Sequence, residues 1–356
     1  MLRSSHPTLL WIPAQGGNDI LAGCSIECPY ILCISGVRMV ELGSKKALTW
    51  KLFVWSGKAL MMTMRQNILD MSYPQVQELV CSLGEPAYRA DQIVWWVYQK
   101  LATSFEEMTD LPQSLRQKLA SVAALSSMIS VYKKVSADGQ TRKVLFKLGD
   151  GRTIESSLML YEKAGSSRER RTVCVSTQVG CTLGCPFCAT GQQGFERNLR
   201  PSEIIEQVLY FMRLVSAEQL KGEAATDPSR RPVTNVVFMG MGEPLANYEA
   251  VWQSIVTLNS KHGLELGVRQ ITVSTVGLVP QIKRLAGENI HVELAISLHA
   301  ANDALRNKLV PINKKYPLSQ LIPACREYFK KTGRRPTFEC TLFQGVNDSV
   351  NHAGEL

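Results

Sequence analysis

The alternation of strand-like and helix-like segments after Arg171 constrains the fold of this chain more than any other feature. The residue pattern predicts strands at 172–177, 235–240, 270–275, 291–297 and 336–343. Between them, apolar residues at helical spacing predict helices at 201–218, 248–260, 279–288 and 318–331. Such alternation builds a parallel sheet with right-handed crossovers, so we expect an α/β fold. In barrels of this kind the chemistry gathers at the carboxyl ends of the strands.

Three further segments precede the alternation. Residues 1–66 have no sustained period and are expected to be an irregular leader, whose three cysteines do not repeat the spacing of the later ones: Cys24, Cys28 and Cys33. Residues 67–127 predict a helical accessory module, with helices near 72–80, 90–101 and 112–124. Residues 128–165 predict a β-meander with strands at 128–136, 141–148 and 153–160, joined by Asp-Gly turns at 138–139 and 150–151.

Three cysteines, Cys181, Cys185 and Cys188, lie in a loop rich in glycine and proline after the first strand of the alternating region. Their spacing is CxxxCxxC, and no fourth cysteine is close enough to complete a structural zinc site, which needs four protein ligands. Soft thiolates grouped in this way suit an iron–sulfur cluster. Three ligands on a four-iron cluster leave one iron free, as reductive cleavage of S-adenosylmethionine requires. The spacing therefore predicts a [4Fe-4S] cluster with this cofactor.

The charge and the cysteine content of the chain limit the class of binding partner and the cellular compartment that we expect. The formal net charge of +9 favours a polyanionic partner such as nucleic acid, although basic runs are also common on solvated surfaces. Clustered thiols among ten cysteines fit a reducing compartment, so we expect the protein in the cytoplasm. The apolar run at 47–64 carries Lys51 and Lys58, so it does not predict a membrane span.

Residues 153–197, with 240–245 and 297–299, closely resemble the radical S-adenosylmethionine RNA methyltransferases of the RlmN/Cfr family. The matching pieces are Thr-Ile-Glu155-Ser-Ser-Leu, Cys174-Val-Ser-Thr-Gln-Val-Gly-Cys181, Phe-Cys188-Ala-Thr-Gly-Gln-Gln-Gly-Phe and Phe-Met-Gly-Met-Gly-Glu243-Pro-Leu. The resemblance extends from about Ser72 to the end of the chain. It implies a partial (β/α) radical-SAM barrel over residues 166–356.

The resemblance also implies the cofactor-binding residues. Gly242-Glu243-Pro244 is similar to the motif that receives the amino group of S-adenosylmethionine, where a glycine allows close approach and a carboxylate can pair with the ammonium group. On its own, this tripeptide would be a turn with a solvated glutamate. Other positions similar to cofactor-contacting residues, for which ordinary structural roles are the alternative, are Ser274, Ser297, Leu298 and His299.

Two catalytic residues follow from the same resemblance. Glu155 is implied to accept or shuttle a proton during methyl transfer, whereas the bare pattern would make it an outward-facing strand carboxylate. Cys174 is implied to be a resolving thiol, which forms a transient disulfide with a methyl-carrying cysteine. Its alternative is a small core side chain, a common use of cysteine.

The implied activity is methylation of C2 of an adenosine in 23S ribosomal RNA, and also of the adenosine next to the anticodon in transfer RNA. A Cfr-like enzyme would methylate C8 instead, and a basic iron–sulfur protein that binds RNA or transfers electrons is the non-enzymatic alternative. An electron donor such as flavodoxin or ferredoxin is implied, and the oligomeric state is not predicted. RNA contacts are expected on the helical module and on basic loops, with four candidates: Arg89, Lys100, Arg168 and Arg171.

The family's methyl-carrying cysteine follows the last barrel strand, and it has no counterpart in this sequence. Cys325 and Cys340 lie in the wrong motifs to replace it. We therefore expect a fragment of a longer protein, inactive in methylation by itself but able to assemble a cluster. The alternative is a natural short form that binds cluster, cofactor and RNA.

Overall fold

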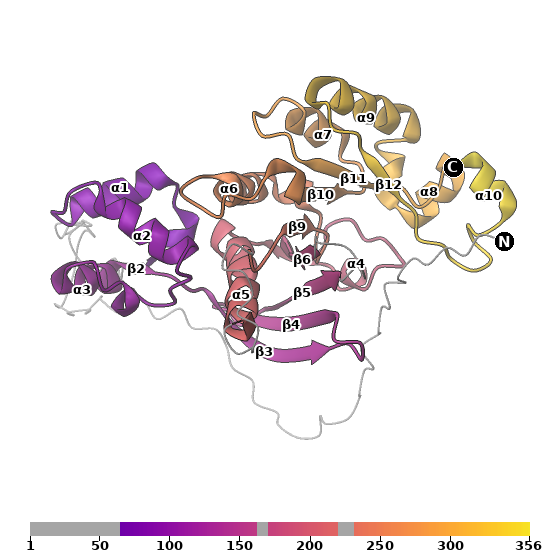
Figure 1. Ribbon diagram of the computed structural model, residues 1–356. Coiled ribbons are helices and arrows are strands. Elements are labelled where there is room, and N and C mark those ends of the chain that lie inside the picture. Colours follow the sequence, from indigo (N-terminus) through magenta and orange to yellow (C-terminus); the bar gives the residue numbers. More distant parts are fainter. Residues whose placement is uncertain (1–64, 162–169, 220–230) are drawn as a thin grey trace, which may run out of the picture. The chain divides into compact units, whose positions relative to one another are not determined.

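The computed structural model describes residues 65–161, 170–219 and 231–356 (Figure 1). Most of the expected leader, including its three cysteines, and the RNA candidate Arg168 lie outside the described residues. Among the described residues, no helix is long and apolar enough to cross a membrane.

The helical module contains the three helices that the sequence predicts, α1 (Tyr73–Ser82), α2 (Arg89–Tyr98) and α3 (Gln113–Val122). Helix α1 begins after Ser72, whose backbone N–H donates to the Gln75 side chain at 2.8 Å, as in a capping box. Around the helices lie the 3₁₀ turns η1 (Ile68–Asp70) and η2 (Phe105–Glu107) and the short parallel pair β1 (Gln66–Asn67) and β2 (Ala123–Ala124).

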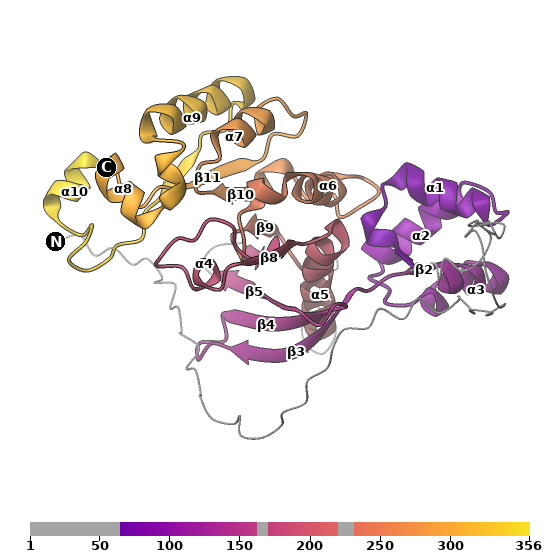
Figure 2. The same cartoon turned by 180° about the vertical axis from the view of Figure 1, so that it is seen from behind.

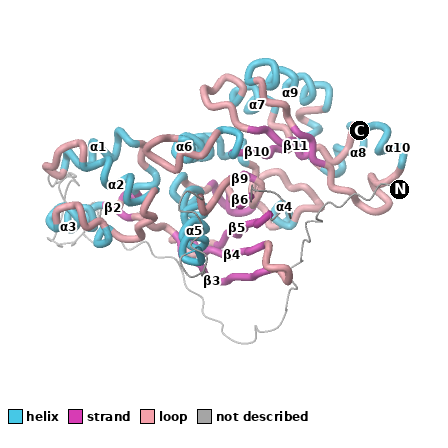
Figure 3. The backbone as a smooth tube through the Cα atoms, viewed as in Figure 1, coloured by secondary structure: helices cyan, strands magenta, loops and turns pink. Residues whose placement is uncertain are grey.

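The main sheet has eight strands in the order β12-β11-β10-β9-β6-β5-β4-β3, all of which Figure 1 labels. Figure 3 draws the strands in magenta. Strands β6 and β9 to β12 are parallel to one another, and the antiparallel meander β3–β5 continues the same sheet because β5 pairs with β6. The strands are β3 (Met128–Val135), β4 (Thr141–Leu148), β5 (Thr153–Tyr161), β6 (Arg170–Cys174), β9 (Asn235–Phe238), β10 (Ile271–Thr275), β11 (Glu293–Ser297) and β12 (Thr337–Glu339).

The helices between the parallel strands also follow the predicted alternation, which confirms the α/β fold class. They are α5 (Pro201–Gln219), α6 (Tyr248–Asn259), α7 (Val279–Leu285) and α9 (Leu318–Thr332). Besides β1, β2, η1 and η2, the elements that the sequence analysis did not predict are β7 (Gln178–Gly180), β8 (Phe195–Asn198), α4 (Ala189–Gln192), α8 (Asp303–Leu309), α10 (Val350–Glu355), η3 (Pro244–Asn247), η4 (Val268–Gln270) and η5 (Pro311–Lys314).

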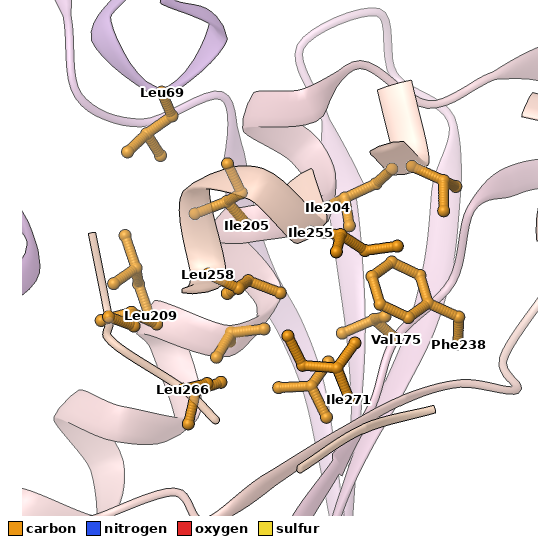
Figure 4. Packing of buried hydrophobic residues seen from close by; sticks show 14 of the residues in the cluster. Leu69, Val175, Ile204, Ile205, Leu209, Phe238, Ile255, Leu258, Leu266 and Ile271 are labelled. Atoms are coloured by element: carbon orange, nitrogen blue, oxygen red, sulfur yellow. The ribbon is translucent and has the colours of Figure 1, made fainter. Parts of the chain in front are cut away.

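The two faces of the sheet differ in chemistry. On one face, Val175, Phe238 and Ile271 pack with apolar side chains of α5 and α6, such as Ile204 and Ile255, in a fully buried core (Figure 4). Because side chains alternate along each strand, the intervening residues point to the other face. We call this the polar face, and its members include Lys134, Lys143, Glu155, Ser157, Cys174, Thr272, Ser274, Ser297 and Glu339.

Candidate functional site

Strand register brings Glu155 and Cys174 together on the polar face. Cys174 of β6 lies opposite Ser157 of β5, and Glu155 is two residues nearer the carboxyl end of β6. The Ser176 hydroxyl donates to the Glu155 carbonyl at 2.5 Å, which continues this register past the end of β6. Diagonal neighbours on one face of an antiparallel pair lie about 7–8 Å apart. The two candidate catalytic residues therefore face the same space.

The surroundings of these two residues set their chemistry. Burial raises the pKa of the Cys174 thiol to about 11, although the hydroxyl of Ser157 and the charge of Lys143 act in the opposite direction. The thiol is therefore protonated near neutral pH. The ammonium group of Lys143 lies 2.6 Å from a carboxylate oxygen of Glu155, and both side chains are about half exposed. Glu155 is thus an accessible, ion-paired carboxylate near a partly buried thiol.

A small hairpin, β7–β8, carries the cysteine loop. The two strands pair in antiparallel fashion, and the backbone N–H of Cys181 donates to the Gly194 carbonyl at 2.9 Å. Gly180 has a φ of +73°, and a Cβ atom there would lie 1.8 Å from the Gly194 oxygen. Only glycine fits this position, because both the backbone conformation and the close approach exclude a side chain.

The three thiols of the loop interact electrostatically. Burial raises the pKa of Cys181 and, to about 12, that of Cys185, and each is raised further by neighbouring thiols and by Glu243. Within the described part of the chain, no group of three or more His, Cys, Asp or Glu side chains is close enough to hold a single metal ion. The donor set, three soft thiols on one loop, has the chemistry that an iron–sulfur cluster requires, and binding would displace the thiol protons.

His299 packs against the cysteine loop. Its ring meets Phe187, between the second and third cysteines, edge to face with a centroid distance of 4.9 Å. The Thr341 backbone N–H donates to its Nδ1 at 3.1 Å, so that nitrogen carries no proton. Burial, with the nearby charge of Arg306, lowers the pKa of His299 to about 4, so the ring is neutral. This arrangement supports the structural alternative for His299 and also places it beside the expected cluster.

Glu243 is buried, at 3% exposure, so it is not the solvated glutamate of a simple turn. Its two carboxylate oxygens accept backbone N–H bonds from Leu245 and Val276, each at 3.0 Å, and burial raises its pKa to about 7. Gly242 has a φ of +97°, and a Cβ atom there would lie 2.5 Å from Cβ of Gln178. The glycine is therefore required for packing against β7, a reason that the sequence analysis missed.

The remaining predicted cofactor residues lie at neighbouring strand ends. Ser274 of β10 and Ser297 of β11 approach each other, with their hydroxyl oxygens 3.3 Å apart on the polar face. Leu298 is buried, and its backbone N–H and that of His299 both donate to the Glu339 carbonyl, at 2.9 and 3.2 Å. The ends of β10, β11 and β12 are thereby joined beside the cysteine loop.

Two residues of this region were missed by the sequence analysis. Arg306 of α8 is fully buried, and its guanidinium donates to the carbonyls of Leu298, Val276 and Ser297 and to the side chain of Asn313. Burial lowers its pKa to about 10. Glu339 of β12 lies exposed on the polar face. Only the strand pattern around Glu339 could have indicated it, and no motif marks Arg306.

The RNA candidates have different surroundings. Arg89 and Lys100 lie against the exposed aromatic rings of Tyr88 and Trp95, respectively, with cation-to-centroid distances of 5.0 Å in both cases. Arg171 is buried, and its guanidinium donates to the Arg231 carbonyl at 2.9 Å. The low exposure of Arg171 disfavours it as an RNA contact, and the contacts of Arg89 and Lys100 with RNA stay predictions.

Comparison with known proteins agrees with this fold. Residues 66–125 match the "Ribosomal RNA large subunit methyltransferase N-terminal domain" family, and residues 175–353 match the radical SAM superfamily. The "Probable dual-specificity RNA methyltransferase RlmN" of Moorella thermoacetica is 48% identical over 83% of this chain and 80% of its own length. The protein of the same name from Roseiflexus sp. is 43% identical over 82% of this chain and 77% of its own length.

A solved structure is similar throughout the same region. The radical SAM methyltransferase from Sphaerobacter thermophilus superimposes with a TM-score of 0.75 at 46% sequence identity, covering 82% of this chain and 80% of that one. The sequence motifs, the sheet and the two family matches agree. The chain belongs to the RlmN family of radical S-adenosylmethionine RNA methyltransferases.

Proposed function

We propose that this protein methylates C2 of an adenosine in 23S ribosomal RNA and of the adenosine next to the anticodon in transfer RNA. The relatives named above carry the words "dual-specificity RNA methyltransferase", which supports two RNA substrates. The observation in this chain that carries the proposal is the placement of Glu155 and Cys174 as diagonal neighbours on the polar face. A protein that only bound RNA or transferred electrons would have no use for this pair.

The proposed cofactor-binding residues lie on the cysteine loop and at the neighbouring strand ends. Cys181, Cys185 and Cys188 would hold a [4Fe-4S] cluster, which when bound supplies the electron that cleaves S-adenosylmethionine. The residues proposed to contact S-adenosylmethionine are Gly242, Glu243, Ser274, Ser297, Leu298 and His299. Because both oxygens of Glu243 already accept backbone N–H bonds, its main contribution is to fix the loop at the end of β9 against the end of β10. Flavodoxin or ferredoxin in the cytoplasm is the proposed electron donor.

The two polar-face residues would act on the RNA base and on the product. Glu155 would remove the proton from C2, and its ion pair with Lys143 holds the carboxylate at the polar face until a base arrives. The transferred carbon would by then be bonded to C2 of the base, and Cys174, having lost its proton, would release the product by attacking the sulfur of the methyl-carrying cysteine. The new S–S bond replaces the C–S bond, whose electron pair stays with the carbon, which then takes a proton. We assign the methyl-carrying thiol to no residue of this sequence.

The test is an anaerobic assay with reconstituted cluster, S-adenosylmethionine, a reductant and RNA hairpins carrying the target adenosine. Because no residue of this sequence is assigned as the methyl carrier, the assay uses a fusion of this chain to the C-terminal segment of the Moorella thermoacetica relative. Mass spectrometry of the digested RNA should find 2-methyladenosine. Replacement of Glu155 by Gln should lower its yield by at least about 100-fold, the usual effect of losing a general base, while 5′-deoxyadenosine still forms. The matched control is Glu218→Gln, because Glu218 is also a half-exposed, ion-paired glutamate but lies outside the site.

The alternatives predict other results. Formation of 8-methyladenosine would replace the C2 proposal by the Cfr-like one. If reduction yields no 5′-deoxyadenosine although the cluster is present, the radical mechanism is wrong. An equal loss of product in both glutamate variants would remove Glu155 from its proposed role.

A further inference from the structure

Lysines and an exposed aromatic ring line the polar face where the sheet ends. The register places Lys134 of β3 opposite Lys143 of β4, and Tyr132 opposite Leu145, on the same face as Glu155. Lys147 also belongs to this face, two residues beyond Leu145. Tyr132 is 61% exposed, and it takes part in none of the aromatic or cation–π contacts found among the described residues.

Two of the three lysines on this face have no carboxylate partner among the described residues. Like charges directly opposite each other on antiparallel strands are destabilising, and Lys134 and Lys143 form such a pair. Lys143 is compensated by Glu155, at 2.6 Å. Among the described residues, neither Lys134 nor Lys147 has an ion pair with a carboxylate.

The opposite face of the same strands is different. Arg142 of β4 pairs with Glu218 of α5 at 2.5 Å, and Lys133 of β3 lies 5.5 Å from the centre of the Tyr210 ring. Cations on the helix-covered face therefore have partners within the fold. The unpaired lysines are confined to the face that carries the proposed catalytic residues.

The sheet fixes a short distance between Lys134 and the proposed catalytic thiol of Cys174. Lys134, Lys143, Ser157 and Cys174 lie in one row across four adjacent strands. Adjacent strands are about 4.8 Å apart, so Lys134 lies roughly 14 Å from Cys174 along the row. A nucleotide or two beside a base held at Glu155 would cover this span.

We propose that Lys134, Lys147 and Tyr132 form an RNA-docking strip on the polar face of β3 and β4. The two lysines would bind backbone phosphates beside the target adenosine, and the exposed ring would stack on an unpaired base. This inference rests on the proposed RNA substrate, and it adds the part of the surface over which the RNA reaches the proposed catalytic residues. It also explains why like charges remain opposite each other at this edge of the sheet.

The experiment measures binding of the full chain to the RNA hairpin as a function of salt concentration. The variant Lys134→Gln/Lys147→Gln should weaken binding severalfold and reduce the slope of log K against log salt by about 1.4, the value for two single-strand phosphate contacts. The matched control is Lys133→Gln/Arg142→Gln, which removes the same charge from the other face of the same strands. It should change the affinity by less than about twofold.

Tyr132→Ala provides a second, independent readout. It should weaken binding at least about fivefold without changing the salt slope, because stacking does not involve counterion release. Far-UV circular dichroism of each variant verifies the fold. Equal weakening by both double variants, or an unchanged salt slope in Lys134→Gln/Lys147→Gln, would overturn the docking strip. If the unaltered protein binds no RNA, the proposed function itself fails, so the two failures can be told apart.

Discussion

Burial controls the reactivity of Cys174, the residue proposed to release the product. Its pKa of about 11 lies above the ordinary thiol value of 9.0, and the cause is loss of solvation of the thiolate. At pH 7.5, two units of pKa make the thiolate fraction roughly 100-fold lower than that of an ordinary cysteine. The resting enzyme would thus keep this thiol protonated until the reaction requires it.

Peptide-resolved alkylation with iodoacetamide tests this state. The rate at Cys174 should still rise between pH 9 and 11, since only the thiolate reacts. Cys81, exposed on α1, is the internal control and should react much faster at pH 7.5. A plateau for Cys174 near pH 9 would show that burial does not suppress its ionisation.

Lys143 should assist the same thiol, because its charge lowers the pKa of Cys174. Replacement of Lys143 by Met should therefore slow alkylation of Cys174 at pH 8.5, whereas Lys147→Met, farther along β4, should leave the rate unchanged. If both variants slowed alkylation equally, the cause would be the lower net charge of the protein and not a local effect of Lys143 on Cys174.

At the scale of single residues, the sequence indicated which side chains are candidates for the site but not what surrounds them in the fold. Glu155 and Cys174 could be selected only by resemblance, because an outward carboxylate and a core cysteine have the same local pattern. The strand register was needed to show that they share a face. Burial of Glu243 and the requirement for glycine at 242 also depend on long-range contacts that no local pattern contains.

At the scale of elements, one buried side chain joins the strand ends that surround the cysteine loop. Arg306 of α8 donates to carbonyls at and after the ends of β10 and β11. A buried guanidinium is tolerated when hydrogen bonds satisfy it, and removing it leaves buried carbonyls without a donor. The geometry of these strand ends should therefore depend on Arg306.

Replacement of Arg306 by Met should lower the free energy of unfolding by about 3 kcal/mol, since hydrogen bonds to charged groups contribute roughly 1.5–3 kcal/mol each and the lost bonds are only partly replaced. Urea unfolding measures the change. The control, Arg326→Met, removes an exposed arginine of α9 and should change stability by no more than about 0.5 kcal/mol. Equal stabilities of the two variants would contradict the structural role of Arg306.

The elements were predictable to different degrees. Long amphipathic helices such as α5 and the meander strands follow from periodicity and turn residues, since their patterns extend over eight residues or more. The β7–β8 hairpin was missed because strands of three and four residues show too little alternation. Helix α8, with seven residues, is likewise too short for a reliable period.

At the scale of the whole molecule, the helical module and the barrel share contacts that the sequence did not predict. A carboxylate oxygen of Asp70, at the end of η1, accepts the backbone N–H of Ser202 at 2.7 Å, in the first turn of α5. The Asp70 carbonyl accepts a bond from Gln253 of α6, also at 2.7 Å. Figure 2 shows this region from behind. An acidic residue at a helix N-terminus is stabilising whether or not it belongs to the same segment.

These contacts predict that the module and the barrel unfold together. Buried residues of both, from Ile68 to Tyr328, form one continuous core cluster, so loss of either part would expose the other. Asp70→Ala should lower the free energy of unfolding by about 1 kcal/mol, the usual cost of removing an N-terminal helix cap, and Asp70→Asn by less, because the amide oxygen still accepts. Hydrogen exchange resolved by peptide, followed through a urea titration, should give one midpoint for α2 and for β10, shifted equally by Asp70→Ala. Separate midpoints, with only α2 shifted, would mean that the module is an independent unit, and its RNA contacts would then not be fixed relative to Glu155.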